Sequence, residues 1–291
     1  MRIYKFGGAS VKDANGVKNL ITILNTLGSE KTLIVVSAMG KTTNSLELVV
    51  KNYFDNKEEL QYSINEVFTF HNKILNDLFN DSKHQIFSDV KEILENLRIF
   101  LKRNKSPDYS FVYDQVVIFG EILSTKIINS YLNHSNIRCN WLDARTLIKT
   151  DSKYRDANLN WEITKNSISN GVNTKLLNIT QGFIASDSNN FSTTLGREGS
   201  DYTAAIFAYC LNAESVTIWK DVPGVLNADP RVFKKPQLLN KISYTEAIEL
   251  AFYGASVIHP KILQPLQKKE IPLYVKSFLN PSGNGTAISR G

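Results

Sequence analysis

The stretch that decides the fold is RIYKFGGASVKDANGVKNLITIL, residues 2–24 of this 291-residue chain. Residues 2–6 read as a short buried strand. The helix expected next has one apolar face, made of Val11, Ala14, Val17, Ile21 and Leu24. The following apolar run, residues 32–37, is rich in β-branched residues, as expected of a strand covered on both faces. A second helix is expected to begin near Asn44, and this alternation predicts an α/β fold with a mostly parallel sheet.

Residues 55–105 interrupt the alternation. They are rich in Lys, Glu and Asn, and their apolar residues recur at helical spacing, which predicts a helical insertion beside the sheet. The other elements expected are a helix over 114–132, a strand over 138–143, an antiparallel hairpin within 178–195, a helix near 200–211, and strands over 214–219 and 272–278. The Gly- and Ser-rich tail, residues 280–291, is typical of a linker or a frayed end.

The composition is that of an ordinary globular chain, with 42% hydrophobic and 21% charged residues. The net charge is +6, but the lysines are scattered, so we expect no nucleic-acid partner. No apolar run approaches the roughly 18–20 residues of a membrane span, and the polar start is unlike a signal peptide, so we expect no membrane partner. Cys139 and Cys210 lack the spacing of a zinc site or a disulfide scaffold, which favours a reducing, cytoplasmic setting.

Lys5, Gly7 and Gly8 lie where the first strand gives way to a helix. Because glycines carry no side chain, the backbone N–H groups here can approach an anion closely, and the positive end of the helix adds to the attraction. A lysine at the strand edge would bring a movable positive charge to the same place. These residues predict a phosphate site; the alternative is a tight turn beside a surface lysine.

The stretch MGKTTN, residues 39–44, resembles the end of a P-loop. Val35, however, stands where that loop requires its first glycine, so we reject an ordinary P-loop. The short polar loop could still bind a small polar ligand through Ser37 or Thr43.

Two further stretches carry polar residues suited to a ligand. Glu121 interrupts an apolar helix, and it either faces a ligand ammonium or lies on an exposed face. In GREGSD, residues 196–201, Arg197 could hold a carboxylate with two hydrogen bonds, and Ser200 could donate to an anion. Asp201 could cap the next helix, hold the lysine of the first strand, or help position a metal.

The loop WKDVPGVLNADPR, residues 219–231, begins where a strand ends. Ligands of open α/β sheets bind beyond the carboxyl ends of the strands, so this loop is placed to meet one. Asp221 marks its first turn, and Arg231 could contact phosphates. A surface loop with an incidental arginine is the alternative.

Together, these pieces resemble the aspartate kinases of the amino-acid kinase superfamily. The matching stretches run in order and cover nearly the whole chain: KFGGAS, VVSAMGKTTN, FGE, TQGFIA, GREGSDYTAA, WKDVPGVLNADPR, YGASVIHPKILQPL and IPLYVKSF. The resemblance implies a three-layer αβα sandwich with two lobes. The lobe over about 1–195 would bind the amino acid, and the lobe over about 196–291 would bind the nucleotide. Regulatory ACT domains, which many relatives carry, would begin where this chain stops.

The resemblance also implies roles, residue by residue. Lys5 and Asp201 would be catalytic, with Asp201 organising the lysine. The residues expected to bind the amino acid are Ser37, Thr43, Glu121, Arg197 and Ser200. Those expected to bind the nucleotide are Lys5, Gly7, Gly8, Ser10, Lys220, Asp221, Leu226, Arg231 and Ser256.

Four positions depart from the family pattern. Lys220 replaces a usual threonine, Leu226 a tyrosine, Ser256 a lysine and Glu198 a glycine. We therefore hypothesise that Lys220 supplies the positive charge that Ser256 no longer provides. The alternative is that Lys220 points to solvent.

The activity that the resemblance implies is phosphoryl transfer from ATP, with Mg²⁺, to the side-chain carboxylate of L-aspartate, at the start of lysine, threonine and methionine biosynthesis. A carboxylate nucleophile is already ionised at neutral pH, so the chain needs no Ser-His-Asp pattern. One alternative is a nucleotide- or amino-acid-sensing protein with little turnover, which Leu226 and Ser256 favour. Another is a kinase for a different amino acid, such as glutamate. We expect a homodimer.

Overall fold

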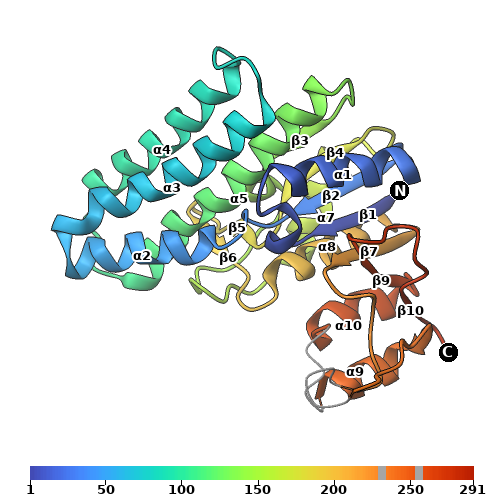
Figure 1. Ribbon diagram of the computed structural model, residues 1–291. Helices are drawn as coiled ribbons and strands as arrows, with labels where there is room; N and C mark the ends of the chain where they lie inside the picture. Colours follow the sequence, from blue (N-terminus) through green and yellow to red (C-terminus); the bar gives the residue numbers. More distant parts are fainter. Residues whose placement is uncertain (229–233, 253–257) are drawn as a thin grey trace.

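An eight-stranded sheet runs through the centre of the computed structural model, which describes residues 1–228, 234–252 and 258–291 (Figure 1). Its strands, in spatial order, are β3 (Asn140–Leu142), β4 (Asn178–Gln181), β2 (Thr32–Val36), β1 (Arg2–Phe6), β7 (Ser215–Lys220), β9 (Leu273–Ser277), β10 (Thr286–Ser289) and β8 (Lys241–Ser243). All neighbouring pairs are parallel except β9 and β10. The prediction of a mostly parallel sheet is confirmed.

Helices cover both faces of this sheet and give three layers. Tyr4 and Phe6 of β1 face a core shared with α1 (Ala14–Leu27), α2 (Thr42–Asp55), α3 (Lys57–Leu78), α4 (Gln85–Arg103) and α5 (Tyr109–His134). Ile3 faces the other core, which holds α6 (Ala144–Leu147), α7 (Trp161–Gly171), α8 (Gly199–Leu211), α9 (Tyr244–Phe252) and α10 (Pro260–Lys268). Because side chains alternate along a strand, Lys5 points to the same face as Ile3, toward α8.

The helical insertion expected over 55–105 is present. It consists of α3 and α4, which pack beside α2 and α5 away from the C-terminal strands (Figure 1). The buried face of α4 repeats at helical spacing, with Ile86, Val90, Leu94, Leu97 and Leu101. The prediction of a helical insertion is confirmed.

Two sequence predictions were wrong in detail. Residues 178–181 belong to the central sheet as β4, and the antiparallel hairpin consists of β5 (Ile184–Ser186) and β6 (Ser192–Thr194) instead. The tail is not a frayed end, since its residues 286–289 form β10 between β9 and β8. Thr286 and Ile288 are fully buried there, and the Thr286 hydroxyl accepts a hydrogen bond from Val225 N at 2.8 Å. The strand is short and directly follows glycines and serines, so the sequence pattern does not predict it.

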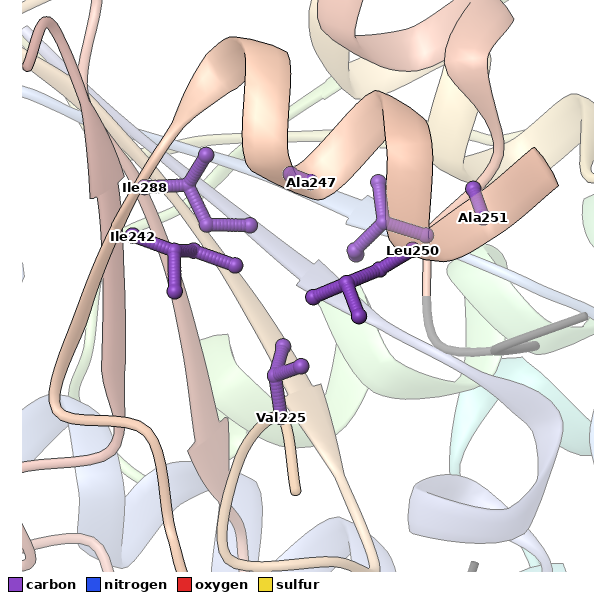
Figure 2. Close-up of a pocket in the computed structure, with 7 residues that line it drawn as sticks. Val225, Ile242, Ala247, Leu250, Ala251 and Ile288 are labelled. Atoms are coloured by element: carbon purple, nitrogen blue, oxygen red, sulfur yellow. The ribbon is translucent and has the colours of Figure 1, made fainter. Parts of the chain in front are cut away.

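A small apolar void lies beneath α9. Val225, Ile242 of β8, Ile288 of β10 and Leu250 of α9 converge on it (Figure 2). Its volume is about 10 Å³, and among the described residues those that surround it are all apolar. A site of this size without polar partners holds no ordered water, so we treat it as a packing gap. Among the described residues, none of the helices is both long and apolar enough to cross a membrane.

Candidate active site

A cavity of about 320 Å³ lies where β1 and β2 end and α8 begins. Its walls are formed by Lys5, Gly8, Ser37, Ala38, Gly40, Thr43, Glu121, Phe183, Gly196, Glu198, Gly199, Ser200 and Asp201. The structure therefore brings both predicted catalytic residues together with four of the five side chains expected to bind the amino acid. This is the edge of the sheet where parallel strands present their carboxyl ends.

Lys5 and Asp201 form an ion pair at the inner end of this cavity. Lys5 Nζ lies 2.6 Å from Asp201 Oδ1, and the two side chains are 11% and 1% exposed. Asp201 stands in the first turn of α8, which packs against the face of β1 that carries Lys5. Of the three roles considered for Asp201, holding Lys5 is the one the geometry shows.

The pKa of Asp201 is lowered although the carboxyl is buried. Desolvation by burial would raise this pKa, but the positive charges of Lys5 and then Lys220 outweigh it. Lys220 Nζ lies 3.8 Å from Asp201 Oδ2. Asp201 is therefore ionised at neutral pH, and Lys220 does not point simply to solvent.

The glycines of the opening turn are needed for close approach. A Cβ on Gly8 would lie 2.8 Å from the carbonyl oxygens of Ala38 and Gly40, because the loop after β2 crosses directly over it. Gly40 N donates to Gly8 O at 3.0 Å and ties the two turns together. A Cβ on Gly7 would meet only Lys5 Nζ, at 3.2 Å. Gly8 lines the cavity, and Gly7 adjoins the lysine.

Glu121 lies in the cavity wall and not on an exposed face. Its side chain projects from α5 and is buried, and Oε1 accepts a hydrogen bond from Ala38 N at 3.2 Å. Within the described part of the chain, Oε2 has no hydrogen-bond partner. Desolvation by burial raises the pKa of Glu121 to about 8. A buried acceptor without a partner at a cavity wall is suited to a cationic ligand group.

The start of α8 is shaped by left-handed backbone. Gly196 has φ +74° and Glu198 has φ +55°. The usual glycine at position 198 is explained by this conformation, which L side chains seldom adopt. Ser200 packs against the end of β4, where a Cβ on Gly182 would lie 2.6 Å from its hydroxyl oxygen. Arg197 is exposed and does not line the cavity, although both of its neighbours do.

The residues expected to bind the nucleotide are more dispersed. Ser10 and Asp221 line a second hollow, of about 430 Å³, on the other side of the opening turn, together with Lys12, Asn19 and Phe278. The Ser10 hydroxyl donates to Gly7 O at 2.6 Å. Leu226 pairs with Leu238 in an isolated bridge and lines neither hollow. Arg231 and Ser256 lie outside the described residues.

Glu198 and Phe183 are among the cavity residues that the sequence does not mark as ligand-binding candidates. In the sequence, Glu198 stands out only as a departure from the family pattern, yet it lines the cavity together with Asp201 and adds a second carboxylate at the start of α8. Phe183 has φ +71°, and its N–H donates to the Thr203 hydroxyl of α8 at 2.9 Å. Its only sequence signal is that it follows Gly182. In residues 1–228, 234–252 and 258–291, no group of three or more His, Cys, Asp or Glu side chains could by itself hold a metal ion.

Known proteins are similar to this chain in sequence over nearly its whole length. The chain is 30% identical to the lysine-sensitive aspartokinase 3 of Escherichia coli (strain K12) over 298 residues, which cover 98% of this chain and 63% of that protein. It is also 30% identical to the chloroplastic bifunctional aspartokinase/homoserine dehydrogenase 2 of Arabidopsis thaliana, over 98% of this chain and 32% of that protein. The chain thus spans about a third to two thirds of the length of these relatives.

A solved structure and a family profile agree with the sequence matches. The crystal structure of E. coli aspartokinase III in complex with aspartate and ADP matches with a TM-score of 0.89 and 30% identity, covering 100% of this chain and 64% of that one. The predicted three-layer fold is confirmed by this match. The profile of the amino acid kinase family covers residues 1–277. With the order of the strands, the site at the end of β1 and these matches in agreement, the chain belongs to the amino acid kinase family.

Proposed function

We propose that this chain is an aspartate kinase, which transfers the γ-phosphoryl group of ATP to the side-chain carboxylate of L-aspartate. The products would be 4-phospho-L-aspartate and ADP. The proposal is supported by the aspartokinase relatives, which match nearly the whole chain, and by a similar solved structure that holds aspartate and ADP.

One observation in this molecule carries the choice of an amino acid as substrate. Glu121 is buried in the cavity wall, and its Oε2 has no partner within the described residues. An α-ammonium group would supply both the missing donor and a charge opposite to that of the carboxylate. Ser200 lies in the same cavity, and Arg197 lies next to two cavity residues, so both are placed to meet the acidic end of the substrate.

The reaction needs positioning and charge more than proton transfer. A carboxylate oxygen of aspartate attacks the γ-phosphorus, the bond to the bridging oxygen breaks, and the electron pair leaves with ADP. Lys5 would stabilise the charge that builds on the phosphoryl oxygens, and backbone N–H groups near Gly8 and the start of α8 would add to this. Asp201 would hold the Lys5 ammonium in place.

Magnesium would enter with the nucleotide. Mg²⁺ usually keeps several waters and binds substrate phosphates together with one or two carboxylates, so a complete protein site is not required. Asp201 is already paired with two lysines, whereas the exposed Glu198 side chain lines the cavity. Glu198 is therefore the carboxylate that fits this role. Bound Mg²⁺ would neutralise charge on the phosphates.

The remaining expectations belong to the same proposal. The part over about 1–195 would bind the amino acid and the part over about 196–291 the nucleotide, with the cavity at their boundary. The enzyme would be a homodimer, would act early in lysine, threonine and methionine biosynthesis, and would work in the cytoplasm. The free, buried thiols of Cys139 and Cys210 are consistent with a reducing compartment.

The proposal is tested by measuring ADP release with MgATP and either L-aspartate, L-glutamate or no amino acid. The acyl phosphate would be trapped with hydroxylamine as the hydroxamate. We expect ADP and hydroxamate to form in equal amounts with aspartate alone. Faster turnover with glutamate than with aspartate would show that the substrate is glutamate. Tight binding of MgATP and aspartate without turnover would instead favour the sensing protein.

A further inference from the structure

Lys220 lies on the same face of the sheet as Lys5. Lys5 of β1 stands opposite Ile218 of β7, and Lys220 follows Ile218 by two residues. Because side chains alternate along a strand, both lysines point toward α8. Lys5 Nζ lies 2.6 Å from Asp201 Oδ1, and Lys220 Nζ lies 3.8 Å from Asp201 Oδ2. One buried carboxylate therefore has a lysine near each of its oxygens.

This arrangement differs from a pair of ions on the surface. The Asp201 side chain is 1% exposed and that of Lys220 is 24% exposed, so water screens their attraction only in part. Among the residues that line the cavity, Lys220 is absent. It reaches Asp201 from the β7 side, whereas Lys5 lies in the cavity wall. Lys220 is thus placed to act on Asp201 and not on a ligand in this cavity.

The charges on the cavity walls suggest why a second lysine is needed. The start of α8 presents two carboxylates, Glu198 and Asp201, while Lys5 is the one cation among the lining residues that the structure describes. This surplus of negative charge would repel a polyphosphate. A second cation on Asp201 offsets the surplus. Because Lys220 also contacts the Asp201 carboxylate, this carboxylate holds the Lys5 ammonium less tightly.

We propose that Lys220 is a positioning residue of the phosphoryl-transfer site, which holds Asp201 from the β7 side and frees Lys5 to meet the transferred phosphoryl group. The role differs from that of a direct phosphate ligand, because Lys220 acts through Asp201. The proposal rests on the proposed function for the identity of the reaction. Nucleotide affinity, however, can be measured without any acceptor.

The experiment compares the wild-type protein with Lys220→Thr, Lys220→Arg and Lys276→Thr. Lys276 of β9 is the matched control, because it stands opposite Trp219 and therefore points to the other face of the sheet. The measurements are the Kd of MgADP by calorimetry, then kcat and the two KM values. For Lys220→Thr we expect kcat to fall and the Kd of MgADP to rise, each by roughly tenfold or more, the scale of a lost contact to a charged group. The KM for aspartate should change less than twofold.

The other variants separate positioning from general effects. Lys220→Arg should keep most of the activity, and Lys276→Thr should behave as wild type. In an Asp201→Asn background the carboxylate that Lys220 holds has lost its charge, so Lys220→Thr should raise the Kd of MgADP by much less than it does in the wild type. If Lys220→Thr melts below the assay temperature, Lys220→Met keeps the apolar stem and carries the same expectations.

Three results would overturn the role of Lys220. They are unchanged kcat and Kd in Lys220→Thr, a loss in Lys220→Arg as large as in Lys220→Thr, and an equal loss in Lys276→Thr. A wild-type protein that binds MgADP but does not phosphorylate aspartate would refute the proposed function instead. In that case the Kd values of MgADP alone would show whether Lys220 supports nucleotide binding through Asp201.

Discussion

Lys5 Nζ lies 2.6 Å from Asp201 Oδ1, and this ion pair joins β1 to the first turn of α8 at the inner end of the cavity. The pair places a positive charge at the edge of the sheet where ligands of α/β proteins bind. It also couples catalysis to stability, because removing either partner leaves a buried charge with a weaker neighbour.

The first prediction separates these two effects. Lys5→Met should lower kcat by roughly 10²–10³, the scale for losing one preorganised electrostatic donor. It should also lower the melting temperature, since Asp201 would keep only the more distant Lys220. Adding Asp201→Asn should restore much of the melting temperature but none of the activity. Near-normal turnover in Lys5→Met would remove the lysine from the mechanism.

A second prediction uses the two neighbouring glycines as a matched pair. A Cβ on Gly8 would meet two carbonyl oxygens at 2.8 Å, whereas a Cβ on Gly7 would meet only the mobile end of Lys5 at 3.2 Å. Gly8→Ala should therefore destabilise the protein, by about 1–3 kcal/mol. Gly7→Ala should cost less stability than Gly8→Ala, because only the end of the Lys5 side chain must shift, and it should lower kcat by displacing the lysine. Denaturant unfolding and turnover assays measure both. Equal stability losses would contradict this account of the turn.

Much of this site could be predicted from the sequence because its signals are local. The strand, the glycines and the helix at residues 2–24 follow one another directly, and so do the residues at the start of α8. Whether Glu121 faces a ligand could not be decided, because α5 is buried on nearly all sides and its periodicity is lost. The contact of Lys220 with Asp201 depends on the register of β1 and β7, which no local pattern contains.

A third prediction concerns the helical insertion. His71 of α3 is fully buried, and desolvation by burial lowers its pKa to about 4. Its ordinary pKa is 6.5, so between pH 4 and 6.5 the unfolded chain binds more protons than the folded one. His71 therefore costs no stability above pH 6.5, and stability is lost as the pH falls below that value, by up to about 3 kcal/mol.

His71→Gln should remove this acid sensitivity, even if it lowers stability at neutral pH. The exposed His134 offers the control for replacing a histidine by glutamine, and His134→Gln should keep the acid sensitivity that His71 causes. Urea unfolding at pH 7.5 and pH 5.0 gives the comparison. If the wild type and His71→Gln lost the same free energy of unfolding between these values, another group would be responsible.

The last prediction concerns how Glu121 would recognise the substrate. Burial raises its pKa to about 8 from an ordinary 4.5, so the carboxyl is largely protonated in the free protein at neutral pH. Binding an ammonium group requires the ionised form, and binding must therefore release a proton below pH 8. The affinity for aspartate should therefore rise with pH up to about 8 and then stay constant. Below pH 8, the KM for aspartate should fall by nearly tenfold for each pH unit.

Glu121→Gln tests this prediction through two independent measurements. The amide keeps an acceptor for Ala38 N but loses the charge, so the Kd of aspartate should rise roughly 10–100-fold and lose its pH dependence.

The second measurement is stability. The folded protein binds the extra proton between pH 4.5 and 8, so the wild type loses stability as the pH rises through this window. Glu121→Gln removes that loss and should melt at a higher temperature than the wild type at pH 8, by at least about 2–4 °C. The exposed Glu66 provides the control, and Glu66→Gln should change neither quantity. A variant that melts higher but still binds aspartate as the wild type does would show that Glu121 is buried without contacting the substrate.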